Sequence, residues 1–162
     1  TRFNLARSGI ALYGLWPSQK THKRLPRITI KPVLSWKSRI ANVRTVPTGT
    51  GVSYGLTFTT RRPSKLALIP VGYADGYDRH LSNKGHVVIR GKRCPIIGRV
   101  CMNMFVVDVT DLPIVKREDE VVLIGRQGNT EVTADELADL LGTINYEVVA
   151  RLSALLPRII VP

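Results

Sequence analysis

The stretch HVVIRGKRCPII, residues 86–97, contains two short apolar runs on either side of Gly91-Lys92. Both runs are rich in β-branched residues, which favour strands. The pair Gly91-Lys92 fits a two-residue turn, so the stretch predicts a β-hairpin. Similar runs, separated by turn residues, recur at 33–46, 52–60, 65–71, 100–109 and 120–124. Many short strands of this kind predict a mainly β fold, either a closed barrel or a sandwich.

One helix is predicted over residues 133–141. Thr133 is followed three residues later by Glu136, which is a capping-box pattern. Three leucines of the stretch share one helical face, and Gly142 stands where a helix end is expected. The pattern therefore predicts a single short helix near the end of a β-rich chain.

Composition limits the classes of protein that need to be considered. The chain has 162 residues and 44% hydrophobic residues, enough for one cored domain or for one domain plus a fragment. No apolar run approaches the roughly 20 residues of a membrane helix. The sequence starts with Thr rather than Met and has no signal peptide. We therefore expect a piece of a longer cytoplasmic protein.

Two cysteines, Cys94 and Cys101, are too few for a disulfide framework or a zinc site. The three histidines are scattered along the chain, so no metal site is predicted. We expect both cysteines to be reduced. A small core side chain is an equally good interpretation of Cys101.

Charge is distributed very unevenly. The chain carries 24 Lys and Arg against 12 Asp and Glu, a net charge of +12. The first acidic residue is Asp75, so the whole positive excess lies in residues 1–74. One interpretation is a protein that binds nucleic acid or an acidic membrane. The other is a basic surface that faces an acidic part of the protein outside this chain.

Three tyrosines lie beside glycine or small polar residues, where a ligand can approach the backbone. They are Tyr54 in Val-Ser-Tyr-Gly, Tyr73 in Gly-Tyr-Ala-Asp-Gly and Tyr146 in Ile-Asn-Tyr-Glu. Each could equally be a core tyrosine with a satisfied hydroxyl. Ser8-Gly9-Ile10 could donate backbone N–H groups to an anion, although one glycine is weak evidence.

Taken in order, seven segments carry a specific resemblance. They are residues 7–14, 52–55, 69–76, 98–102, 123–125, 143–147 and 157–158. This order resembles the C-terminal part of alanine racemase, a pyridoxal-phosphate (PLP) enzyme, over essentially the whole chain. The family has an N-terminal α/β barrel that carries PLP and a C-terminal β domain.

The resemblance implies a fold and three parts of the chain. Residues 1–18 would be the end of the N-terminal barrel, 19–28 a linker and 29–162 the C-terminal domain. That domain would be a closed Greek-key β-barrel with one short helix. The Schiff-base lysine that binds PLP would lie outside this chain, in the missing barrel.

The resemblance also implies residues that bind the cofactor. Arg7 matches the arginine that bonds the pyridine nitrogen of PLP. A guanidinium is permanently protonated and keeps that nitrogen unprotonated, so the ring is a weaker electron sink. Gly9 and Ile10 match positions whose backbone N–H groups hold the phosphate, and Tyr146 matches the tyrosine that also bonds it.

Tyr54 matches the family's catalytic tyrosine, one of two bases, which acts on the active site of the partner subunit. The resemblance therefore implies a homodimer. Tyr73 and Met102 match residues that line the substrate pocket. The positions along the substrate corridor are matched by Arg79, Arg99 and Ile144. A cationic corridor suits an amino-acid carboxylate.

Two positions depart from the family's usual pattern. Asn103 stands where Asp is usual, so hydrogen-bonding capacity is kept and a charge is lost. Leu155 stands where an arginine is common. Both changes bear on the corridor, and neither affects Arg7, Tyr54 or Tyr146.

We therefore expect the C-terminal part of a racemase that interconverts L- and D-alanine for peptidoglycan, inactive without its barrel. The missing barrel is then expected to be acidic. A basic β-barrel that binds nucleic acid, a non-catalytic homologue and a racemase of another small amino acid remain as alternatives.

Overall fold

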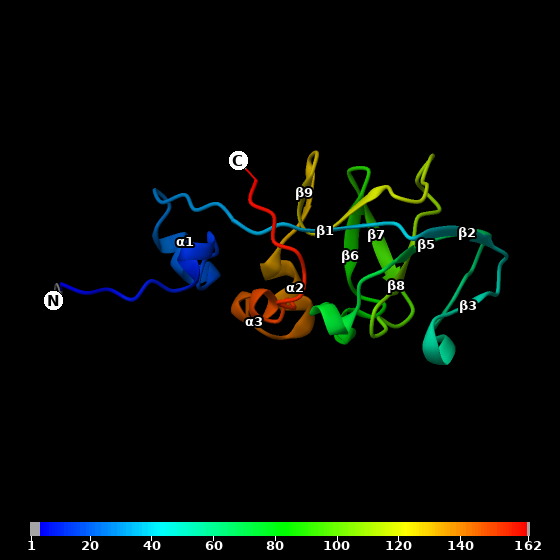
Figure 1. The fold of residues 1–162 in the computed structure, drawn as a ribbon, viewed down its shortest axis with the longest axis horizontal. Coiled ribbons are helices and arrows are strands. Elements are labelled where there is room, and N and C mark those ends of the chain that lie inside the picture. Colours follow the sequence, from blue (N-terminus) through cyan, green and yellow to red (C-terminus); the bar gives the residue numbers. More distant parts are fainter. Residues whose placement is uncertain (1–3, 162) are drawn as a thin grey trace. The chain divides into compact units, whose positions relative to one another are not determined.

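The computed structural model describes residues 4–161, which form two compact units that divide between Ser35 and Trp36 (Figure 1). The first unit has little regular structure: the 3₁₀ turn η1 (Ile10–Tyr13) and the helix α1 (Gln19–Arg24). Ser18 caps α1, because its side chain accepts a hydrogen bond from the N–H of Thr21 at 3.1 Å. The expected linker thus includes a helical turn.

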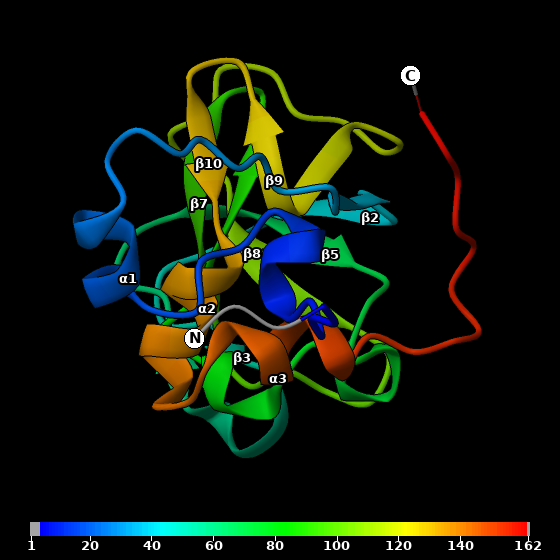
Figure 2. The same cartoon turned by 90° about the vertical axis from the view of Figure 1, so that its left-hand side faces the viewer.

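The second unit is built around one antiparallel sheet. Its strands are β1 (Trp36–Arg39), β2 (Asn42–Val46), β5 (Ser64–Ile69), β6 (His86–Ile89), β7 (Lys92–Ile97), β8 (Phe105–Asp108), β9 (Glu120–Gln127) and β10 (Thr130–Val132). They pair in the order β1-β9-β6-β7-β8-β5-β2, and β10 forms a hairpin with β9 (Figure 2). A separate ribbon pairs β3 (Gly51–Val52) with β4 (Phe58–Thr59). The prediction of a mainly β fold is confirmed.

The two ends of the sheet are formed by strands that follow each other in the chain. β1 pairs with β9, whereas β2 pairs with β5 at the other end. Between them, the N–H of Ile40 donates to Asp119 O at 3.0 Å and that of Ala41 to Leu68 O at 2.9 Å. Within the described residues no strand ladder joins β1 to β2, so strand pairing alone does not establish a closed barrel.

The core lies where the central strands turn their branched side chains inward. Val87, Val88 and Ile89 of β6 are fully buried, and each buried aliphatic side chain contributes about 1.5–3 kcal/mol. Tyr77 stacks on Phe105 with ring centroids 4.8 Å apart. This apolar core holds the loops described below.

The structure corrects the predicted boundaries of several strands. The turn of the 86–97 hairpin is Arg90-Gly91 rather than Gly91-Lys92, because φ is positive at both residues, 51° and 73°. Residues 52–60 are not one strand, since the 3₁₀ turn η2 (Tyr54–Leu56) interrupts them. The strand expected over 100–109 begins only at Phe105.

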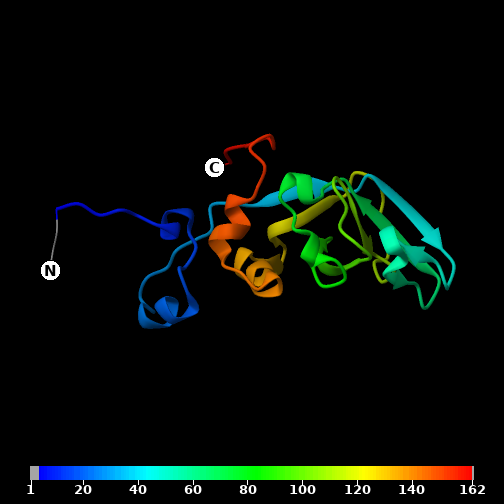
Figure 3. The ribbon, with the colours of Figure 1, turned by 90° about the horizontal axis from the view of Figure 1, so that it is seen from below.

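The predicted helix is present as α2 (Ala134–Leu141). Thr133 caps it by accepting the N–H of Glu136 at 3.0 Å, and Gly142 ends it with φ at 68°. The prediction of one short helix was wrong, because α3 (Asn145–Ala150) packs against α2 (Figure 3). α3 is only six residues long and has no side-chain N-cap, so its sequence carries no start signal.

Within residues 4–161, no helix combines the length and the apolar character needed to cross a membrane.

Candidate active site

Tyr54 lies in a loop with an unusual backbone. Ser53 has φ 63° and ψ −177°, a region that is almost exclusive to glycine, and Leu56 also has a positive φ. Tyr54 itself is 76% exposed. Such a conformation costs about 1–3 kcal/mol and tends to occur at functional sites.

The loop of residues 98–104 holds the Tyr54 loop from one side. Ser53 Oγ donates to the carbonyl oxygen of Arg99 at 2.8 Å. A Cβ on Gly98 would lie 2.8 Å from Val52 O, so only glycine allows this approach. A Cβ on Gly55 would lie 3.5 Å from Arg99 Nε. Arg99 therefore lies directly beside the loop that carries Tyr54.

The same loop holds Tyr73 from its other side. The N–H of Tyr73 donates to Cys101 O at 3.1 Å, and that of Ala74 donates to Met102 O at 2.9 Å. Tyr73 and Ala74 are the first two residues of the 3₁₀ turn η3 (Tyr73–Asp75). Tyr73 and Met102 are both exposed. Residues 98–104 thus bring Tyr54, Arg99, Tyr73 and Met102 into one neighbourhood.

Arg79 is tied to this neighbourhood through its turn, η4 (Arg79–Leu81). Ser82 Oγ bonds to Arg79 O and accepts the N–H of Val100 at 3.0 Å. Asn83 Oδ1 accepts the N–H of Gly98 at 2.6 Å. The guanidinium of Arg79 is therefore carried by a segment that is bonded directly to the 98–104 loop.

Ile144 and Tyr146 lie at the start of α3, and both are exposed. The opposite end of α3 is anchored by Arg151, which forms ion pairs with Asp78 and with Glu147. Burial tends to raise the pKa of the Asp78 carboxyl, but hydrogen bonds from His80 and the charge of Arg151 outweigh it and lower that pKa. The ion pair between Arg151 and Asp78 connects the end of α3 to the segment that carries Tyr73 and Arg79.

Seven candidates from the sequence therefore lie on connected segments of the second unit. Arg7, Gly9 and Ile10 belong to the first unit and are not part of this group. Gly9 precedes η1, and in the described part of the chain no atom lies within 4 Å of the position that its Cβ would take. The first N–H groups of a helical turn have no partner within the turn, so they can bind an anion.

Several residues that hold the site together were missed from the sequence. They are Ser53, Asp75, Ser82, Asn83 and Arg151. Most of their hydrogen bonds join positions far apart in the chain, as Ser53 and Arg99 do, so local pattern carries no signal for them. Positive φ at a serine likewise has no sequence signature.

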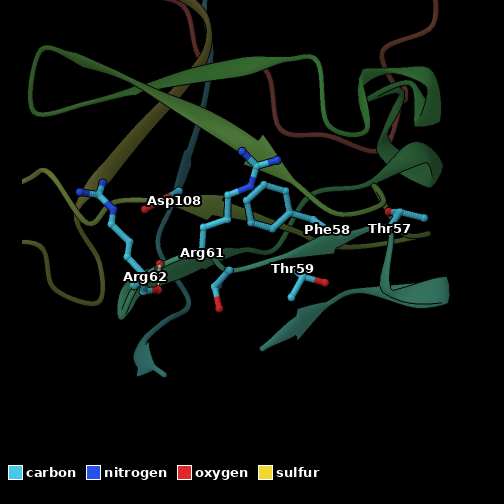
Figure 4. A pocket seen from close by; sticks show the side chains of 8 residues that line it. Thr57, Phe58, Thr59, Arg61, Arg62 and Asp108 are labelled. Carbon is cyan, nitrogen blue, oxygen red and sulfur yellow. Dashed lines mark hydrogen bonds between the residues drawn. The ribbon is translucent and has the colours of Figure 1, made fainter. Parts of the chain in front are cut away.

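A separate hollow lies on the second unit and is lined by Thr57, Phe58, Thr59, Thr60, Arg61, Arg62, Ser64 and Asp108 (Figure 4). One of its cations is already neutralised, because Arg62 Nη2 lies 2.7 Å from Asp111 Oδ2. Its lining includes none of the candidate residues above. Among residues 4–161 no group of three or more His, Cys, Asp or Glu side chains could hold a metal ion.

The fold and the site together define a mainly β domain whose loops present two tyrosines, a methionine and an arginine on exposed segments. The family model "Alanine racemase, C-terminal domain" matches residues 33–160. The chain belongs to this family.

Known relatives agree with this assignment. Alanine racemase of Halothermothrix orenii is 52% identical over 155 residues, covering 96% of this chain and 40% of that protein. A crystal structure of alanine racemase from Bacillus anthracis with bound L-Ala-P is 41% identical at a TM-score of 0.83, covering 90% of this chain and 36% of that one. The alanine racemase of Bartonella henselae, with covalently bound pyridoxal phosphate, is 38% identical at a TM-score of 0.78, covering 89% of this chain and 38% of that one. This chain thus spans about two fifths of the length of its relatives.

Proposed function

We propose that this chain is the C-terminal part of a PLP-dependent alanine racemase that interconverts L- and D-alanine as a homodimer. The observation that carries the proposal is the exposed Tyr54 on a strained loop beside Arg99, in a chain 52% identical to an alanine racemase. A catalytic group this exposed suits a site that a second subunit completes. D-Alanine would serve peptidoglycan synthesis in the cytoplasm.

Racemisation needs one base on each face of the α-carbon, because a proton leaves one face and returns on the other. In our proposal the Tyr54 phenol is one base, and a lysine of the missing N-terminal part is the other. The strained backbone from Ser53 to Leu56 supports this role, since it fixes where the phenol is presented. The chain alone would be inactive without that lysine.

The donor set of this chain suits PLP. Arg7 would bond the pyridine nitrogen, the N–H groups of Gly9 and Ile10 would bond the phosphate, and the Tyr146 hydroxyl would donate to it as well. The open space around Gly9 leaves room for a phosphate against the backbone. When bound, PLP withdraws electrons from the substrate's α-carbon.

The substrate would be a small amino acid. Tyr73 and Met102 would form a narrow wall around a methyl side chain. Arg79 and Arg99 would attract the carboxylate along a corridor that Ile144 also lines. The L-Ala-P bound to the Bacillus anthracis relative supports an alanine-sized substrate.

We also propose that the sheet closes as a Greek-key β-barrel. β1 and β2 are separated by only Ile40 and Ala41, and their pairing partners are β9 and β5. The continuous segment 36–46 thus supplies the strands at both ends of the sheet, as a closed barrel requires. We also propose the domain boundaries 1–18, 19–28 and 29–162; the family match begins at residue 33, and the two compact units divide between Ser35 and Trp36.

The test is a racemisation assay on the full-length enzyme and its Tyr54→Phe variant, with L- and D-alanine and with serine as a competing substrate. We expect kcat to fall by about a hundredfold or more, because one proton-transfer group is removed. Tyr77→Phe is the matched control, since the buried Tyr77 hydroxyl has no hydrogen-bond partner among residues 4–161. An unchanged kcat in Tyr54→Phe contradicts the role of Tyr54, and faster turnover of serine points to another small amino acid.

The nucleic-acid alternative rests on the net charge of +12 alone. Tight, salt-dependent binding of DNA or RNA to the full-length protein is its distinguishing result.

A further inference from the structure

We propose that Ser53 is a positioning residue, which fixes the Tyr54 phenol and Arg99 relative to each other. The proposal rests on the function proposed above and adds to it a residue that does not touch the substrate. It combines a strained backbone, a hydrogen bond across the site and a close approach of two loops.

The backbone of Ser53 is the first observation. Its φ of 63° and ψ of −177° fall in a region that is nearly exclusive to glycine. A serine there is held against its own preference, because glycine would adopt the same conformation at lower cost. A hydroxyl that glycine lacks gives serine a specific use at this position.

The hydroxyl of Ser53 is the second observation. Ser53 Oγ donates to Arg99 O at 2.8 Å and lies 3.4 Å from Cys101 Sγ. Arg99 lies 46 positions further along the chain, so this bond joins two separate loops. The bond links Ser53, which precedes Tyr54, to the backbone of Arg99, whose guanidinium is proposed to line the substrate corridor.

The close contact of the two loops depends on Gly98, whereas Gly55 only borders it at ordinary contact distance. A Cβ on Gly98 would lie 2.7 Å from Ser53 Cβ. A Cβ on Gly55 would lie 3.5 Å from Arg99 Nε. A residue without the Ser53 hydroxyl would leave the Arg99 carbonyl only a weaker donor, Cys101 Sγ at 3.5 Å.

The test uses three variants of the full-length enzyme. Ser53→Ala removes the hydroxyl and keeps the strain, whereas Ser53→Gly removes both. Ser64→Ala is the control, because Ser64 Oγ also donates to a backbone carbonyl, Arg62 O at 2.8 Å, but within its own segment; Ser64 is buried, at 4% exposure, whereas Ser53 is half-buried. Steady-state kinetics give kcat and KM, and hydrogen exchange with mass spectrometry reports on peptides that contain residues 53–56.

We expect kcat to fall about tenfold to a hundredfold in both Ser53 variants, with KM for alanine changed by less than about threefold. Exchange of the 53–56 amides should become about tenfold faster. Ser53→Gly should be more stable than Ser53→Ala while having the same low kcat. Ser64→Ala should lose stability and keep kcat.

A kcat that follows stability across all three variants, or unchanged exchange at 53–56, overturns the positioning role. If the unmodified enzyme does not racemise alanine, the proposed function fails. The exchange data then still decide whether the Ser53 hydroxyl holds the loop.

Discussion

Replacing Gly72 by alanine should force apart the two loops that carry Tyr73 and Met102. A Cβ on Gly72 would lie 2.3 Å from the carbonyl oxygens of both Cys101 and Met102. Ordinary contact begins at 3.4 Å, so the backbones must move by about 1 Å. Gly72 has φ at −150°, which any residue adopts, and the cost is therefore purely steric.

The expected loss of stability follows from two contributions. Forcing a methyl group into a filled space costs about 1–3 kcal/mol. The movement also weakens the hydrogen bonds from Tyr73 N to Cys101 O and from Ala74 N to Met102 O, which adds about 1 kcal/mol. Together these give about 2–4 kcal/mol, or a Tm lower by about 5–15 °C.

Urea and thermal unfolding, followed by circular dichroism, measure this loss. Gly142→Ala is the informative comparison, because Gly142 has φ at 68° but no atom of the described residues within 4 Å of the position that a Cβ would take. That variant should cost only about 1 kcal/mol, from backbone strain alone. Equal losses in the two variants, or a loss below about 1 kcal/mol in Gly72→Ala, would refute the close approach of the loops.

Three further predictions concern the second unit. Thr133→Ala removes the cap of α2 and should lower the free energy of unfolding by about 1 kcal/mol in urea titrations, whereas Thr133→Ser should retain it. Because the fold lowers the pKa of Asp78, its carboxylate stabilises the protein above the ordinary aspartate pKa of about 3.9, and this stability is lost as the pH falls through the lowered pKa of the folded state. Asp78→Asn should therefore flatten the dependence of stability on pH below about pH 4, and an unchanged acid limb argues against the ion pair with Arg151. Burial raises the pKa of the Cys94 thiol to about 11, so peptide mapping after iodoacetamide treatment at neutral pH should find Cys101 alkylated and Cys94 protected until urea is added.

Local sequence pattern was a good guide wherever a local interaction decides the structure. The cap of α2 is a contact between residues three positions apart, Thr133 and Glu136, so it could be read directly from the sequence. The 86–97 hairpin was found for the same reason, although its turn was misplaced by one residue. α3 was missed because it is six residues long and is stabilised by packing on α2 rather than by signals of its own.

The sequence by itself determined the mainly β class and the main helix, because alternation and capping depend on neighbours along the chain, and its ordered motifs carried the family resemblance that implies the candidate residues. Only the tertiary structure decided how Tyr54 is presented. Tyr54 is exposed, and the preceding Ser53, with its positive φ, is hydrogen-bonded to Arg99, 46 positions away. A strained backbone persists only when distant contacts hold it, and such contacts exist only once the loops have been brought together by the fold.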